Sequence, residues 1–551
     1  MTRSILLRLV FAAAFAIHVA PAFATPVPTE SGMVDGVNEG VIRVFKGIPY
    51  AAPPVGERRW RAPEPAPAWQ DVRQANTFSP ICPQIGAYPE NAPAEPQSED
   101  CLTLNVWMPA ATPTAKLPVM VWIYGGGLVN GSGSTPLYAG DRLAQRGVVV
   151  VTFNYRLGAL GFLAHPELNK ESKHGGSGNY GLLDQIAALQ WVRRNIAAFG
   201  GDPDQVTIFG QSSGAMSVSM LIASPLAKGL FRRAIGQSGG VFEPVALDPL
   251  FTPEGAAQAG ERFAARAGAK TLADLRRKTV DELLTARFHP QFNIDGHALP
   301  KAPYDAYATG AHNNVDLLIG TNADEGAYFL TESKVTVANF YDVLGQAFPG
   351  WLVSFVGAEP GTTDAEAHAS AAAFNGDMRF RWNMWAWARL AAADNRNRVF
   401  YYQFSRTPPL SQGDLYFGQG ATHGVEMAYV FDHLDQQKVA WDAKDRELAA
   451  LIPAYWTNFA KTGDPNGQNL PRWPEFRASP GQAMNLADTT APIRIPNEDR
   501  LQRIDTVYAT ARFVSSNLYA VIGAAAALIL LLLALIVRTI RRRRRRARGT
   551  L

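Results

Sequence analysis

The spacing of apolar residues along the chain changes between two patterns. Continuous apolar runs at residues 119–124 and 148–153 predict strands buried on both faces, and residues 205–209 again favour a strand. Residues 182–198 and 216–223 instead predict helices. This alternation, without an internal repeat, predicts an α/β fold with a largely parallel central sheet flanked by helices.

Both ends of the chain have patterns typical of membrane targeting. Arg3 and Arg8, an apolar stretch over residues 9–19 and small residues before Thr25 predict a signal peptide over residues 1–24, with a short buried helix as the alternative. Residues 518–537 are uncharged and long enough to cross a bilayer, so they predict a transmembrane helix. The alternatives are a helix buried in the fold and a processed sorting tail.

The positive charge of the chain is concentrated behind this apolar stretch. The net charge is +4, yet eight arginines lie within residues 538–551, so residues 1–537 carry −4. Clustered arginines beside a span stay on the cytoplasmic side, which makes 538–551 a cytoplasmic tail and places the body in the periplasm or outside the cell. The acidic body argues against nucleic acid as a partner.

The two cysteines, Cys82 and Cys101, would be exported with this body. An oxidising compartment favours a disulfide between them, and two free buried thiols are the alternative.

A nucleophile motif follows the strand predicted at 205–209. Gly210-Gln211-Ser212-Ser213-Gly214 has the G-x-S-x-G pattern, in which a sharp turn between strand and helix exposes the serine hydroxyl. Ser212 is therefore the candidate nucleophile. It needs a histidine base and a carboxylate that holds the base, and both are expected later in the chain. Six histidines follow Ser212, and the residues alone do not select one: His289, His297, His312, His368, His423 and His433.

Several further motifs occur in a fixed order between residues 30 and 490. They are Phe45–Tyr50, Ala51–Gly56, Arg59–Arg61, Ser98–Trp107, Asn154–Gly158, Gly178–Gln185, Asn195–Ile196, Phe199–Pro203 and Phe459–Asn466. Together they resemble the type-B carboxylesterase and cholinesterase family of α/β-hydrolases. The resemblance implies a catalytic domain of that fold over residues 25–510.

The resemblance also implies roles for particular residues. The catalytic acid matches Glu325, with Asp324 as the alternative, and the base matches His423. The glycines after the strand at 119–124 resemble the family's oxyanion loop, so backbone N–H groups of Gly126, Gly127 and Ser213 are expected to form the oxyanion hole. The family pattern further suggests a Cys82–Cys101 disulfide and an Arg59–Glu99 pair, for which we expect an exposed position and little effect on stability.

Two departures from the family pattern bear on the substrate. Gln211 stands where many relatives have glutamate, which removes one negative charge from the pocket. Residues 83–100 contain no tryptophan, and Tyr88 is the one aromatic residue there, so choline esters are not expected as preferred substrates.

The sequence therefore predicts a membrane-anchored serine carboxylesterase that hydrolyses neutral, fairly apolar carboxylic esters through an acyl-enzyme. No cofactor or metal is expected, and the sequence does not indicate the oligomeric state. A cell-surface adhesion protein of the same family is the alternative from another class, but such relatives lose the catalytic serine. A lipase or amidase would differ only in substrate.

Overall fold

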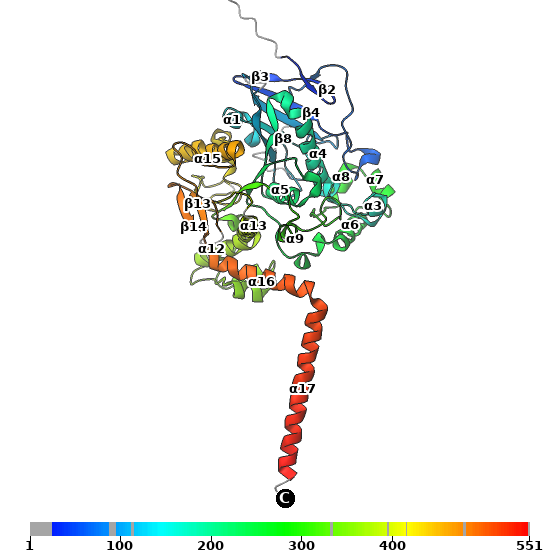
Figure 1. Ribbon diagram of the computed structural model, residues 1–551, viewed down its shortest axis with the longest axis vertical. Helices are drawn as coiled ribbons and strands as arrows, with labels where there is room; N and C mark the ends of the chain where they lie inside the picture. Colours follow the sequence, from blue (N-terminus) through cyan, green and yellow to red (C-terminus); the bar gives the residue numbers. More distant parts are fainter. Residues whose placement is uncertain are drawn as a thin grey trace, which may run out of the picture.

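The protein is described by a computed structural model that covers residues 25–86, 95–111, 115–330, 334–393, 396–414, 416–477 and 481–548. The predicted signal peptide and Tyr88 lie outside these ranges. Figure 1 shows a body built of strands and helices, from which a single long helix extends at the C-terminal end.

A large mixed sheet forms the centre of the body. Its eleven strands have the order β14-β13-β12-β11-β10-β9-β7-β8-β6-β4-β3, and a smaller sheet has the order β1-β2-β5. The six pairings from β8 through β7 and β9 to β13 are parallel, whereas β3, β4, β6 and β14 pair antiparallel. This is the predicted fold class, a largely parallel sheet in an α/β protein.

The strands of the described residues have the following bounds. They are β1 (Val27–Thr29), β2 (Gly32–Asp35), β3 (Val37–Glu39), β4 (Ile42–Pro49), β5 (Arg73–Gln74), β6 (Thr103–Pro109), β7 (Leu117–Ile123), β8 (Val149–Phe153), β9 (Gly201–Gln211), β10 (Arg233–Gln237), β11 (Asp316–Asn322), β12 (Val399–Phe404), β13 (Gln482–Leu486) and β14 (Ala491–Arg494). The predicted strands at 119–124, 148–153 and 205–209 correspond to β7, β8 and β9. β8 is buried over its whole length, as its continuous apolar run predicts.

Helices connect the strands. They are α1 (Asp141–Ala144), α2 (Gly158–Phe162), α3 (Pro166–Glu171), α4 (Tyr180–Asn195), α5 (Ser213–Ala223), α6 (Pro253–Arg266), α7 (Leu272–Arg277), α8 (Val280–Thr285), α9 (Pro303–Ala308), α10 (Phe340–Gly345), α11 (Gly350–Val356), α12 (Asp364–Gly376), α13 (Trp382–Ala393), α14 (Met427–Val430), α15 (Ala443–Thr462), α16 (Glu498–Ser516) and α17 (Leu518–Arg548). A 3₁₀ segment, η7 (Glu325–Leu330), follows β11, and a π-helical turn, η8 (Asp377–Arg381), lies between α12 and α13. The predicted helices at 182–198 and 216–223 correspond to α4 with the turn after it and to α5.

The C-terminal helices differ in their contacts with the body. α16 packs on the body through Leu501, Ile504 and Tyr508, and it continues to Ser516, past the predicted domain end at residue 510. In α17, residues Leu518–Arg542 form an apolar stretch of 25 residues. Its most apolar part makes no buried contact with the rest of the described protein. Figure 1 shows α17 leaving the end of α16 and pointing away from the body, opposite the end that carries β2 and β3.

The disulfide and its surroundings stabilise the N-terminal part of the fold. Cys82 and Cys101 are bonded, so the predicted pairing is present and the free-thiol alternative is wrong. Arg59 pairs with both oxygens of Glu99, at 2.7 and 2.5 Å. The expectation of an exposed pair is wrong, because the Arg59 side chain is only 8% exposed and also donates to the carbonyls of Arg276 and Lys278.

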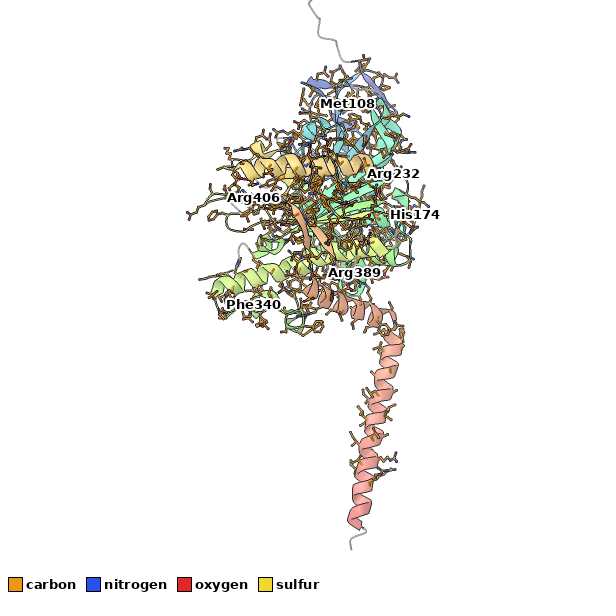
Figure 2. All side chains as sticks on the ribbon, turned by 60° about the vertical axis from the view of Figure 1, so that its left-hand side comes forward. Met108, His174, Arg232, Phe340, Arg389 and Arg406 are labelled. Atoms are coloured by element: carbon orange, nitrogen blue, oxygen red, sulfur yellow. A yellow bond between two sulfur atoms is a disulfide. The ribbon has the colours of Figure 1, made fainter. Side chains whose placement is uncertain are left out.

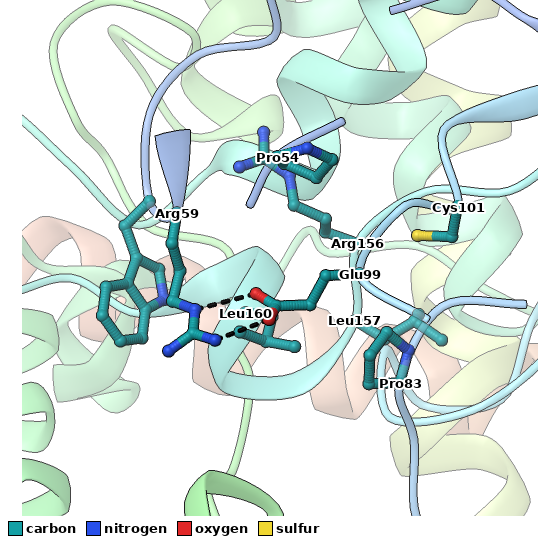
Figure 3. Close-up of a pocket in the computed structure, with 9 residues that line it drawn as sticks. Pro54, Arg59, Pro83, Glu99, Cys101, Arg156, Leu157 and Leu160 are labelled. Carbon is teal, nitrogen blue, oxygen red and sulfur yellow. Dashed lines mark hydrogen bonds and ion pairs between the residues drawn. The ribbon is translucent and has the colours of Figure 1, made fainter. Parts of the chain in front are cut away.

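Figure 3 shows that this ion pair lies in a small pocket beside the disulfide. The pocket is lined by Pro54, Arg59, Trp60, Pro83, Glu99, Cys101, Arg156, Leu157 and Leu160. None of the candidate triad residues lines it, so it belongs to the framework of the fold.

Candidate active site

Ser212 lies at a strained turn between β9 and α5. Its φ of 56° and ψ of −127° fall in a region that residues other than glycine rarely adopt. Two glycines permit the turn, because a Cβ on Gly214 would overlap the carbonyl oxygen of Ile123 and a Cβ on Gly210 would lie 2.6 Å from the backbone of Gly214. The Ser212 side chain therefore stays at the end of the strand, partly accessible to solvent.

His423 and Glu325 are joined by a short hydrogen bond. The distance from His423 Nδ1 to Glu325 Oε2 is 2.6 Å, the Glu325 side chain is fully buried, and the His423 side chain is 10% exposed. The other carboxylate oxygen, Oε1, accepts the backbone N–H of Asn322 at 2.7 Å. Because an ionised carboxylate only accepts, Nδ1 donates this hydrogen bond and Nε2 is the accepting nitrogen of the ring.

The accepting nitrogen of His423 faces the segment that carries Ser212, the candidate nucleophile. Its Nε2 lies 3.3 Å from the side-chain amide nitrogen of Gln211, the residue that immediately precedes Ser212. The amide donates this hydrogen bond, since Nε2 is unprotonated in the tautomer described above. The pair of His423 and Glu325 is thus brought next to the residue that precedes Ser212, from segments that are far apart in the sequence.

A second buried carboxylate supports this arrangement. Glu426 accepts the side-chain amides of Asn322 at 2.6 Å and of Gln237 at 3.3 Å. Burial raises the pKa of Glu426, and the nearby charge of Glu325 raises it further. Glu426 thus links the end of β11, through Asn322, to the end of β10, through Gln237.

The glycine loop after β7 packs against Ser212. A Cβ on Gly125 would lie 3.0 Å from the Cβ of Ser212, so a side chain here would crowd the serine. Gly126 and Gly127 have φ values of 105° and 62°, which favour glycine. Ser213 begins α5, and its Oγ accepts the backbone N–H of Leu128 at 3.2 Å, which links the loop to the helix.

Aromatic side chains surround the imidazole. The ring of Phe380 stacks on His423 with centroids 4.5 Å apart, and Tyr328 and Phe329 lie 5.7 and 6.2 Å away. Phe380 comes from η8, which is fixed by a buried ion pair between Asp377 and Arg381. π-helical turns are frequent at functional sites, and this one places an apolar ring beside His423.

The structure also separates the alternatives that the sequence left open. Asp324 accepts the backbone N–H of Ala421 at 2.8 Å and donates its own N–H to the carbonyl of Ala421, so it ties two loops together, whereas the imidazole contacts Glu325. His433 contacts the carbonyl of Leu137 at 3.0 Å and Asp141 at 3.1 Å, elsewhere in the fold.

Sequence reasoning missed several residues that organise the site. Asn322 lies three residues before Glu325, and Glu426 lies three residues after His423, but no sequence pattern indicates a role for either. Gln237 ends the neighbouring strand, and its carbonyl accepts the N–H of Ser212 at 2.9 Å. Phe380 lies in the π-helical turn η8, and no sequence pattern around it indicates a place in the site. Proximity to a recognised motif could have indicated the first two, whereas the others depend on the packing of distant segments.

Comparison with known proteins gives one consistent result. The model of the carboxylesterase family matches residues 24–349 and 350–506. A fumonisin B1 esterase of Sphingopyxis macrogoltabida is 40% identical over 460 residues, which cover 81% of this chain and 84% of that protein. A para-nitrobenzyl esterase of Bacillus subtilis is 37% identical over 506 residues, covering 87% of this chain and 98% of that protein.

Solved structures agree with these relatives. A para-nitrobenzyl esterase structure superposes with a TM-score of 0.76 at 35% identity and covers 87% of this chain and 99% of its own. A carboxylesterase of Geobacillus stearothermophilus has a TM-score of 0.75 at 34% identity, with 87% and 100% covered. The shared fold is that of the α/β-hydrolases.

Proposed function

Because the chain belongs to the carboxylesterase family, whose members are serine hydrolases of carboxylic esters, we propose that Ser212, His423 and Glu325 are its catalytic triad. Carboxylesterase activity itself follows from the family. The observation that supports the triad is the 2.6 Å hydrogen bond between His423 and Glu325 beside a serine in a strained turn.

The proposed reaction proceeds in two halves. Ser212 Oγ attacks the ester carbonyl carbon while His423 Nε2 takes the hydroxyl proton, and the resulting oxyanion collapses as that proton passes to the departing alcohol. A water molecule then loses a proton to His423 and attacks the acyl-enzyme, which releases the carboxylic acid and restores the serine hydroxyl. Glu325 keeps the imidazole in the required tautomer and stabilises its charged form.

The oxyanion of both tetrahedral intermediates needs hydrogen-bond donors. We assign this role to the backbone N–H groups of Gly126, Gly127 and Ser213. The close packing of the glycine loop on Ser212 supports the assignment, as does the position of Ser213 at the start of α5, where backbone N–H groups are unpaired.

The surroundings of the imidazole favour neutral, fairly apolar esters. Tyr328, Phe329 and Phe380 form an aromatic wall beside His423, and Gln211 contributes an uncharged amide. A panel of p-nitrophenyl esters with acyl chains of increasing length tests this preference. The acetate and butyrate should be hydrolysed, and faster hydrolysis of an ester with a charged acyl chain would contradict the proposal.

The triad is tested on p-nitrophenyl butyrate with two serine variants. Ser212→Ala should lose several orders of magnitude in kcat/KM, because it removes the nucleophile. Ser213→Ala keeps its backbone N–H and should lose far less. A Ser212→Ala enzyme as active as the wild type would reject the proposed nucleophile.

We further propose that the protein is exported and anchored in a membrane by α17, with residues 25–510 forming the catalytic domain and residues 538–551 lying in the cytoplasm. Residues 518–537 measure about 30 Å as a helix, which matches a hydrocarbon core of about 30 Å. Ending the chain after Ser516 should release active enzyme from membranes. Persistent membrane association of that variant would place the anchor elsewhere.

A further inference from the structure

The exposed aromatic side chains of the body are concentrated in a few segments. Among the described residues before α17, six aromatic side chains are exposed, and they are Phe329, Tyr341, Trp351, Phe355, Phe417 and Phe513. Trp351 and Phe513 are each 63% exposed. Large exposed aromatic groups gathered in one region usually mark a binding surface.

Helix α11 is apolar on both of its sides. Leu352, Val353 and Val356 are buried against the body, whereas Trp351 and Phe355 point to solvent. The seventeen residues from Tyr341 to Gly357 contain a single charged side chain, that of Asp342. A surface helix normally has a polar outer face. The outer face of α11 instead carries two large apolar rings beside Ser354, whose hydroxyl donates to the carbonyl of Gly350 within the helix, so this face suits an apolar environment.

This surface lies at the end of the body from which α17 departs. Figure 2 places Phe340, the first residue of α10, at the lower end of the body, the end from which α17 extends, although α17 leaves from the other side of that end in this view. α11 packs on α16, where Arg503 donates to the carbonyl of Val356 at 3.4 Å. Phe513 lies in the last turn of α16, just before α17 begins at Leu518. A bilayer crossed by α17 therefore begins close to Phe513.

The same surface is connected to the catalytic site. The guanidinium of Arg379 lies 4.8 Å from the ring centre of Phe329 and 5.7 Å from that of Phe348, which lies between α10 and α11. Phe329 is itself 6.2 Å from the ring of His423 and 38% exposed. Aromatic contacts thus lead from the catalytic imidazole to the segment that precedes Trp351.

We propose that Tyr341, Trp351, Phe355 and Phe513, here called the aromatic face, rest on the bilayer that α17 crosses, so that the exposed edge of the catalytic site at Phe329 takes up esters from the lipid surface. Aromatic rings are favoured at the boundary between headgroups and hydrocarbon. Arg379, which is exposed and stacks on Phe329, is placed to meet lipid phosphates. The inference rests on the proposed anchor and on the esterase activity.

The contact with lipid can be measured without any catalytic assay. The full chain is reconstituted in phosphatidylcholine vesicles as three separate variants, Trp351→Cys, Phe355→Cys and Val41→Cys, each labelled with an environment-sensitive NBD fluorophore. The two native cysteines form a disulfide, so the introduced thiol is the one that reacts. Val41 is 68% exposed and adjoins β4, near the opposite end of the body in Figure 1, which makes it the matched control.

The labels at 351 and 355 should emit at shorter wavelength than the label at 41 and lose much of their fluorescence to lipids that carry a shallow doxyl quencher. A label at Ile529→Cys, within α17, should be quenched by a deep doxyl group. Quenching at 529 with none at 351 and 355 would overturn the aromatic face while leaving the anchor intact. Absence of quenching at all positions would overturn both. If the label at 351 emits at short wavelength but the doxyl lipids do not quench it, the label is covered by protein, such as a second copy of the chain. That result would also overturn the proposal.

A second measurement connects the surface to the substrate. The double variant Trp351→Ser/Phe355→Ser should hydrolyse a long-chain p-nitrophenyl ester dissolved in the vesicles several-fold more slowly than the wild type. Its rate on water-soluble p-nitrophenyl acetate should be unchanged, which shows that the triad is intact. The control Val41→Ser/Val72→Ser, at two other exposed valines, should affect neither rate. An equal loss on both esters, or no loss on either, contradicts delivery from the lipid surface.

Discussion

Replacing Glu325 by glutamine tests how this proposed catalytic acid controls the proposed base, His423. In the wild type, Oε1 of Glu325 accepts the N–H of Asn322, and Oε2 accepts the Nδ1 proton of His423. A glutamine at this position must place its carbonyl oxygen where Oε1 lies, because the backbone N–H of Asn322 needs an acceptor. Its NH₂ group then faces Nδ1 and donates to it. The imidazole must move its proton to Nε2, where it can no longer accept the proton of Ser212.

The size of the effect follows from two contributions. A carboxylate and an imidazolium with charge centres about 4 Å apart attract each other by about 4 kcal/mol at an effective dielectric constant near 20. Loss of that attraction in the transition state slows the reaction by about 10³. The wrong imidazole tautomer slows the reaction further. The corresponding change of aspartate to asparagine in a serine protease triad lowers kcat by about 10⁴. We therefore expect kcat/KM of Glu325→Gln to fall by about 10³ to 10⁴.

The assay is hydrolysis of p-nitrophenyl butyrate, with thermal unfolding measured in parallel to confirm that the variant is folded. Asp324→Asn is the matched control, because it makes the same chemical change one residue earlier at a carboxylate that contacts Ala421. It should lose much less activity. The reasoning is refuted if Glu325→Gln keeps its rate within tenfold, or if Asp324→Asn loses as much.

Three further predictions concern pH dependence and stability. Gln211→Glu places a carboxylate beside His423 Nε2, which favours the protonated imidazole. The acidic limb of the profile of kcat/KM against pH should therefore move to higher pH by about one to three units. An unmoved limb would contradict the 3.3 Å contact. Asp184→Asn breaks a buried ion pair, in which the Asp184 side chain is 0% exposed and that of Arg156 is 4% exposed. The free energy of unfolding, measured in urea, should fall by about 3–5 kcal/mol. A loss below about 1 kcal/mol would show that Arg156 finds another partner. Replacing both cysteines of the disulfide by serine opens a loop with a sequence separation of 19 and should lower the same free energy by about 3 kcal/mol, and an unchanged urea midpoint would contradict this.

The parts of the site that depend on neighbouring residues could be predicted from the sequence. Ser212 was found because the strand, the turn and the helix around it are consecutive, and the two glycines that permit the turn lie within two residues of it. The buried strands were predicted well for the same reason. β8 is buried on both faces, and its apolar run is continuous.

The pairing of distant segments was not accessible in that way. Glu325 and His423 are 98 residues apart, and only the family resemblance selected them. Gln237 and Phe380 take their roles from the order of strands in the sheet and from a π-helical turn, neither of which leaves a local pattern. The burial of Arg59 was missed because its carbonyl partners lie more than 200 residues away.

The most direct test of the proposed triad is covalent labelling of the full-length protein with a fluorophosphonate, which phosphonylates an activated serine as fluoride leaves. Peptide mapping by mass spectrometry then locates the adduct. The account predicts one adduct per chain, on the peptide that contains Ser212, with labelling abolished in Ser212→Ala and strongly slowed in His423→Ala. An adduct on another residue, or Ser212→Ala protein that still hydrolyses esters at the wild-type rate, would contradict it.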